Sequence, residues 1–141
     1  MNHSNDLAVM VQAIFEPDGL LSRVLTQHQT RTGQIQMAVA VAQALTMKQP
    51  LVVEAGTGVG KTFAYLVPAL LSGQRVLVST ATKTLQDQLF HRDLPLVREA
   101  LGSDADVALL KGRANYVCRY RLGRAIGHPE IDGRRIPRLA A

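Results

Sequence analysis

Lys61 and Thr62 are the residues with the clearest chemistry, and they end a glycine-rich turn in the segment LVVEAGTGVGKT at residues 51–62. A turn with glycine at positions 56, 58 and 60 can direct several backbone N–H groups at one anion. The lysine would supply a point charge for the β and γ phosphates of a nucleotide, and the threonine hydroxyl is placed to bind Mg²⁺. The spacing predicts a phosphate-binding loop for ATP and Mg²⁺, formed by Ala55, Gly56, Thr57, Gly58, Val59, Gly60, Lys61 and Thr62.

One position departs from the common loop pattern G-x-x-x-x-G-K-[ST], because Ala55 stands where the first glycine is usual. A plain glycine-rich turn is the alternative interpretation. A plain turn does not account for a lysine followed directly by a threonine. It also does not account for the apolar, strand-like run at 51–53 before the turn or the apolar helical pattern after it. The combination favours the phosphate-binding loop.

The elements around the loop alternate in type along the chain. Alternation of strand and helix is typical of a parallel α/β sheet, in which ligands bind beyond the carboxyl ends of the strands. Because the loop, residues 80–84 and residues 111–113 all follow predicted strands, we expect them at one edge of the sheet. Apolar runs and helical spacing predict strands at 51–54, 75–79 and 106–110, and helices at 34–47, 61–71, 82–90 and 94–101.

The positive charge of the chain is concentrated near its end. From residue 111 onward eight lysines and arginines face two carboxylates, so this segment carries +6 while the whole chain carries +5. A basic block after a nucleotide-binding module indicates a polyanionic partner such as nucleic acid. A solvated or disordered basic tail is the alternative.

The composition limits the class of protein. With 141 residues, 47% of them hydrophobic, the chain is long enough for one domain with a core. No apolar run approaches the ~18 residues of a membrane span, and the first ten residues lack the features of a signal peptide. The single cysteine, Cys118, excludes an internal disulfide and suits a reducing compartment, so we expect a cytoplasmic protein.

Four blocks of the sequence resemble those of superfamily 2 DNA helicases of the DinG/YoaA type, which are related to the XPD-like iron–sulfur helicases. The block RTGQIQM at 31–37 resembles the Q-motif region of that family. EAGTGVGKT at 54–62 is similar to its motif I, in which alanine at the first loop position is usual. STATKTLQDQL at 79–89 resembles motif Ia, and LKGRANYVC at 110–118 resembles the segment that leads to the first cysteine of a cluster-binding insertion.

The resemblance implies an α/β fold of the RecA-like P-loop NTPase kind, with three layers α/β/α and a parallel sheet, of which this chain would hold an incomplete first helicase lobe. It also implies three parts of the chain. Residues 1–28 would be an N-terminal helical extension, residues 29–110 the first part of the ATP-binding domain, and residues 111–141 the start of an iron–sulfur insertion with a basic tail.

The resemblance further implies roles for individual residues. Arg31 and Gln34 would contact the adenine of ATP, while Lys61 and Thr62 would act on its phosphates and Mg²⁺. Cys118 would be the first of four ligands of a [4Fe–4S] cluster. Single-stranded or forked DNA would be contacted by Thr80, Thr82, Gln86, Lys111 and Arg113.

An ATP-dependent DNA helicase of this type also needs a DE-x-H block, the arginines of a second lobe and three further cysteines. None of these groups is present in the sequence after residue 62. We therefore expect the ATP-binding N-terminal part of such an enzyme, with little hydrolysis and no cluster of its own. Two alternatives stay open. One is a small stand-alone P-loop nucleotide-binding protein or kinase, and the other is a non-catalytic nucleic-acid-binding module.

Overall fold

The computed structural model describes residues 3–25, 29–127, 130–131 and 134–135. These residues divide into two compact units, Met1–Val107 and Ala108–Ala141. Each unit is described by itself below.

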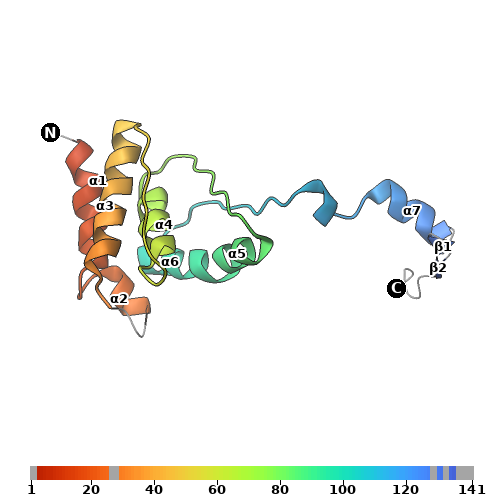
Figure 1. The fold of residues 1–141 in the computed structure, drawn as a ribbon, viewed down its shortest axis with the longest axis horizontal. Helices are drawn as coiled ribbons and strands as arrows, with labels where there is room; N and C mark the ends of the chain where they lie inside the picture. Colours follow the sequence, from red (N-terminus) through yellow and green to blue (C-terminus); the bar gives the residue numbers. More distant parts are fainter. Residues whose placement is uncertain (1–2, 26–28, 128–129, 132–133, 136–141) are drawn as a thin grey trace. The chain divides into compact units, whose positions relative to one another are not determined.

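Helices make up the regular structure described in the first unit (Figure 1). A π-helix, η1, follows α5 directly and leads into α6, so that residues 83–101 form one continuous helical stretch. The bounds are α1 His3–Phe15, α2 Leu20–Val24, α3 Thr32–Met47, α4 Lys61–Leu71, α5 Lys83–Gln88, η1 Leu89–Asp93 and α6 Leu94–Leu101.

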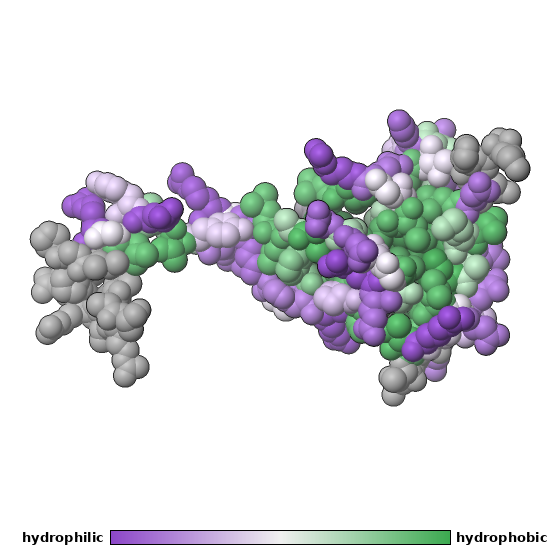
Figure 2. Space-filling model, turned by 180° about the vertical axis from the view of Figure 1, so that it is seen from behind, coloured by the Kyte–Doolittle hydropathy of each residue, from purple (hydrophilic) through white to green (hydrophobic). Residues whose placement is uncertain are grey.

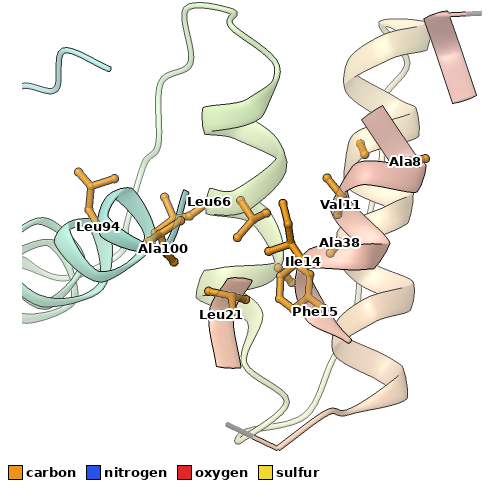
Figure 3. Packing of buried hydrophobic residues seen from close by; sticks show 13 residues of the cluster. Ala8, Val11, Ile14, Phe15, Leu21, Ala38, Leu66, Leu94 and Ala100 are labelled. Atoms are coloured by element: carbon orange, nitrogen blue, oxygen red, sulfur yellow. The ribbon is translucent and has the colours of Figure 1, made fainter. Parts of the chain in front are cut away.

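The core of the first unit lies between these helices. α1 packs on α3, α3 packs on α4, and α6 packs on both α2 and α4. Figure 3 shows Val11, Ile14 and Phe15 of α1 beside Ala38 of α3, with Leu66 of α4 nearby. Ala38 is fully buried, and its small side chain lets the neighbouring helices approach α3 closely. Apolar residues at helical spacing therefore build this core, as their pattern indicates.

The helices that the sequence predicts agree with the structure. α4 and α6 have the bounds predicted for 61–71 and 94–101, and α3 begins two residues before the predicted start at Gln34. The helix predicted at 82–90 is present as α5 over 83–88, and its last two residues begin the π-helix η1. Gly73 and Gly102 follow α4 and α6 with φ of 63° and 59°, values that glycine adopts without steric cost.

The segments predicted as strands, at 51–54, 75–79 and 106–110, follow irregular paths without regular secondary structure (Figure 1). Their apolar side chains are largely uncovered, with Val52 96% and Leu77 91% exposed. A parallel sheet requires neighbouring strands for its hydrogen bonds and a cover on both faces. The parallel sheet consequently stays a prediction. Figure 2 shows apolar side chains gathered on one face of the first unit.

The second unit contains a single turn of 3₁₀-helix, η2 Arg113–Asn115, followed by α7 Arg119–Gly127. Two short strands, β1 Glu130–Ile131 and β2 Arg134–Arg135, pair in antiparallel orientation. The remainder of the predicted basic tail, from 136 to 141, lies outside the described residues. In the described ranges of both units, no helix has the length and apolar character needed to cross a membrane.

Two valines of α1 allow a matched test of this core. Val11 is fully buried, whereas Val9 on the same helix is 60% exposed. We expect Val11→Ala to lower the free energy of unfolding by about 2 kcal/mol, because two buried methyl groups are lost and a cavity is left. Val9→Ala should change it by less than about 0.5 kcal/mol. Urea unfolding followed by circular dichroism measures both, and equal effects would contradict the packing of α1.

Candidate nucleotide-binding site

The predicted phosphate-binding loop lies where α3 and α4 begin side by side. Residues 48–60 run back along α3, so that α4 starts beside the first turn of α3 (Figure 1). This arrangement brings the residues before and within the first turn of α3 to the loop, although they precede it by more than twenty positions. The packing of α3 on α4 thus places the loop beside Arg31 and Gln34.

Gly60 is the residue at which the loop meets α4. It adopts φ 88° and ψ 34°, in the left-handed region, and its carbonyl oxygen accepts a hydrogen bond from the Ala64 N–H at 3.3 Å. A Cβ atom at this position would lie 2.2 Å from Nε2 of Gln34. The left-handed backbone conformation favours glycine here, and a larger residue would also displace the end of the Gln34 side chain.

Arg31 and Gln34 each donate a hydrogen bond to a carbonyl oxygen of the loop. The guanidinium Nη1 of Arg31 donates to the Gly58 oxygen. Nε2 of Gln34 donates to the Gly60 oxygen at 2.9 Å, and the Gln34 side chain is buried. The structure thus brings both predicted residues to the loop, where their described partners are backbone atoms. Their predicted contact with adenine stays a prediction.

The ammonium group of Lys61 is folded back onto the start of the loop. Nζ donates to the carbonyl oxygens of Ala55 at 2.9 Å and Gly56 at 2.7 Å. Four loop carbonyls, at positions 55, 56, 58 and 60, therefore accept hydrogen bonds from cationic or amide side chains. A donor on a carbonyl oxygen reduces the negative charge that the oxygen presents to an incoming anion, which favours phosphate binding at the loop.

Tyr65 is a site residue that the sequence motifs did not reveal. Its side chain forms a hydrogen bond with Thr62, the predicted Mg²⁺ ligand, one turn earlier on α4. Burial is the main cause that raises the pKa of Tyr65, and the negative charge of Asp93 raises it further, while the Thr62 hydrogen bond acts in the opposite direction. The spacing of three residues on one helix is the signal that could have identified this pair.

Asp93 is a buried carboxylate at the end of η1. Nε2 of Gln88 donates to its Oδ2 at 3.3 Å, and Nε of Arg92 lies 4.0 Å from its Oδ1. Its negative charge also acts on Tyr65 of α4, whose pKa it raises. π-Helical turns occur frequently at functional sites.

The predicted DNA-contacting residues of the first unit surround the start of α5. The Thr82 hydroxyl oxygen accepts a hydrogen bond from the Leu85 N–H at 3.2 Å, and so caps the helix. The Thr80 hydroxyl donates to the Thr82 carbonyl oxygen at 3.2 Å. Gln86 lies on α5 and is half-buried. Both threonine hydroxyls therefore order the turn in which they lie.

Lys111, Arg113 and Cys118 belong to the second unit. The backbone N–H of Lys111 donates to the Tyr116 hydroxyl at 2.8 Å, while Arg113 begins η2 and is exposed. Cys118 is an exposed free thiol. Across the described parts of the chain there is no group of three or more His, Cys, Asp or Glu side chains that could hold a metal. One thiolate does not fit a cluster that needs four.

The second unit also presents aromatic and basic side chains together. The guanidinium of Arg124 lies 5.9 Å from the centre of the Tyr120 ring, within the range of a cation–π contact. Tyr120 is 72% exposed. Arg119 and Arg121 flank it in sequence and are exposed as well. Such a surface can attract a polyanion and offer a ring for stacking.

Comparison with known proteins agrees with this geometry. The family model of the DEAD/DEAH box helicases matches residues 34–116, which include the loop, α5 and η2. An ATP-dependent DNA helicase YoaA from Escherichia coli strain K12 is 57% identical over 108 residues, covering 77% of this chain and 17% of that protein. A protein of the same name from Haemophilus influenzae is 49% identical over 126 residues, covering 89% of this chain and 19% of that protein.

A third relative is the ATP-dependent helicase DinG of Mycobacterium tuberculosis strain H37Rv. It is 45% identical over 113 residues, which cover 74% of this chain and 17% of that protein. The chain therefore spans between 17% and 19% of the length of these three curated relatives. No solved structure matches it.

The raised pKa of Tyr65 gives a test of its partial burial against the core. A tyrosine whose pKa is higher in the folded than in the unfolded chain stabilises the fold at lower pH, and that contribution is lost as pH rises above about 10. We expect the free energy of unfolding to fall as pH rises above about 10, and to fall less in Tyr65→Phe. Tyr120→Phe is the control, because Tyr120 is exposed. Identical alkaline declines in both variants would contradict the assignment.

Proposed function

Because the chain belongs to the DEAD/DEAH box helicase family, we propose that it carries the ATP-binding part of an ATP-dependent DNA helicase of the DinG/YoaA type. Membership of this family implies the P-loop NTPase fold. The observation that carries the proposal is the loop at 55–62, whose carbonyls are engaged by Arg31, Gln34 and Lys61 at the junction of α3 and α4. The names of the relatives support the reaction and the DNA substrate.

In this proposal the loop binds the triphosphate of ATP with its backbone N–H groups and the first turn of α4. Lys61 leaves the carbonyls of Ala55 and Gly56 and turns its ammonium group to the β and γ phosphates. The Thr62 hydroxyl would be the oxygen that holds Mg²⁺, which would neutralise part of the phosphate charge. Tyr65, one turn later on α4, would orient the Thr62 side chain.

The base of the nucleotide is proposed to lie near the start of α3. Arg31 is exposed, and its guanidinium already reaches the loop from the side of α3. Contact of Arg31 and Gln34 with adenine is the role that the family resemblance implies for them. The chain contains no DE-x-H block after residue 62, so we propose that it binds ATP and hydrolyses it poorly by itself.

Single-stranded or forked DNA is the proposed second ligand. Thr80, Thr82 and Gln86 carry hydroxyl and amide groups that can donate to phosphate oxygens without reading a base. Lys111 and Arg113 add positive charge, and the Tyr120–Arg124 pair adds a ring with a neighbouring cation. The exposed apolar segments at 51–54, 75–79 and 106–110 are proposed as strands of the parallel sheet of the first helicase lobe. The single thiol supports a cytoplasmic location.

The proposed domain limits place residues 1–28 in a helical extension, 29–110 in the ATP-binding domain and 111–141 in the start of an insertion. Cys118 is proposed as the first ligand of a [4Fe–4S] cluster. The chain has one cysteine, so the residues present do not form the ligand set, and the other thiolates would have to come from outside these 141 residues.

Removal of the Lys61 ammonium tests the nucleotide site. We expect Lys61→Ala to weaken ATP binding by about tenfold or more, because a charge-assisted contact with the phosphates is lost. Lys83→Ala on α5 is the matched control, since Lys83 is exposed and lies outside the loop. Isothermal titration calorimetry with Mg²⁺-ATP measures both. Equal affinities of Lys61→Ala and the unchanged chain would refute the site and favour a non-catalytic binding module.

Salt dependence tests the DNA contacts of the second unit. For single strands, the slope of log K against log salt concentration is about −0.7 for each phosphate neutralised. We therefore expect Lys111→Ala with Arg113→Ala to weaken binding of an oligothymidylate and to reduce the slope by about 1.4. Arg23→Ala in α2 is the control for loss of an exposed cation elsewhere. A slope unchanged by the double substitution would contradict these contacts.

A further inference from the structure

Gln34 is a buried polar residue whose described hydrogen bond goes to the phosphate loop. Its side chain is 7% exposed, and its amide nitrogen donates to the Gly60 carbonyl at 2.9 Å. The two groups are packed so closely that a Cβ at position 60 would lie 2.2 Å from that nitrogen and 2.8 Å from Cδ of Gln34. Because buried amides require partners, the Gly60 carbonyl satisfies one donor of the Gln34 amide.

Gly60, the partner of Gln34, has a backbone conformation that sets the direction of the residues after it. Glycine adopts many backbone conformations, so a hydrogen bond to the Gly60 oxygen restricts the conformations that this residue can adopt. Lys61 and Thr62 follow immediately, and their direction depends on this one residue. The same Gly60 oxygen accepts the first hydrogen bond of α4 from Ala64. A rigid donor on this oxygen therefore fixes the loop and the start of α4 together.

The position of Gln34 makes it suited to this task. It lies in the first turn of α3, and α3 is held by α1 on one side and by α4 on another. Its donor group is therefore fixed by the core and independent of any bound base. Arg31, which also reaches the loop, is exposed and less constrained.

We infer that Gln34 is a positioning residue of the phosphate loop, which raises the affinity for a chain of phosphates whether or not a base is attached. This inference rests on the proposed nucleotide site. It differs from the adenine contact expected for Gln34, because a residue that only reads adenine has no effect on a ligand without a base.

The test compares ligands with and without a base. Methionine has a side chain of similar length to glutamine and is also a good helix former, but it has no amide donor. Gln34→Met therefore removes the hydrogen bond and changes little else. We expect it to weaken binding of inorganic tripolyphosphate with Mg²⁺, and of ATP and GTP, each by about three- to tenfold, as is usual for the loss of one hydrogen bond. Gln36→Ala is the control, because Gln36 lies on the exposed side of the same turn. Calorimetry measures all three ligands.

A second measurement needs no ligand. Hydrogen exchange of the backbone amides at 58–62 in the nucleotide-free chain should become faster in Gln34→Met than in Gln36→Ala, because Gly60 is no longer held. The inference would be overturned if Gln34→Met had the same tripolyphosphate affinity and the same loop exchange rates as the unchanged chain, whatever its affinity for ATP. If the unchanged chain binds neither ATP nor tripolyphosphate, the proposed function fails, and the exchange rates still decide whether Gln34 holds the loop.

Discussion

The site depends on one close contact, the approach of the first turn of α3 to Gly60. A glycine in the left-handed region leaves room for the buried amide of Gln34, and that amide in turn fixes the glycine. A side chain at position 60 would displace the amide of Gln34 and would strain the backbone. The direction of Lys61 and Thr62 follows from this contact, since both residues come directly after it.

The core explains why this contact can form between residues so distant in sequence. α3 carries alanines at its most buried positions, Ala38 and Ala42, so α1 and α4 can both lie close to it. The N-terminal helix α1 is consequently part of the support of the phosphate loop, although it carries no residue of the site. α4 also packs on η1 and α6, so the helical stretch 83–101 belongs to the same core.

The sequence predicts the helices well and the contacts between them poorly. The bounds of α4 and α6 follow from local features, namely apolar residues at helical spacing and the glycines that close each helix. The strand prediction at 51–54 depends on partners that no local pattern specifies, and the structure leaves Val52 uncovered. The π form of η1 also has no signal in the apolar spacing. The loop pattern identifies Lys61 and Thr62, but the hydrogen bonds of Arg31 and Gln34 to loop carbonyls depend on packing.

The two carbonyl contacts of Lys61 have a consequence for the selectivity of the site. Two of the three N–H donors of Lys61 already bind the carbonyl oxygens of Ala55 and Gly56, so phosphate binding as proposed would exchange these partners for phosphate oxygens. A weakly charged anion such as chloride offers little in return for two hydrogen bonds, whereas a polyphosphate replaces them with stronger, charge-assisted ones. In the proposed nucleotide site, the folded-back lysine would therefore favour a polyphosphate over a weakly charged anion, because only the polyphosphate can replace both hydrogen bonds.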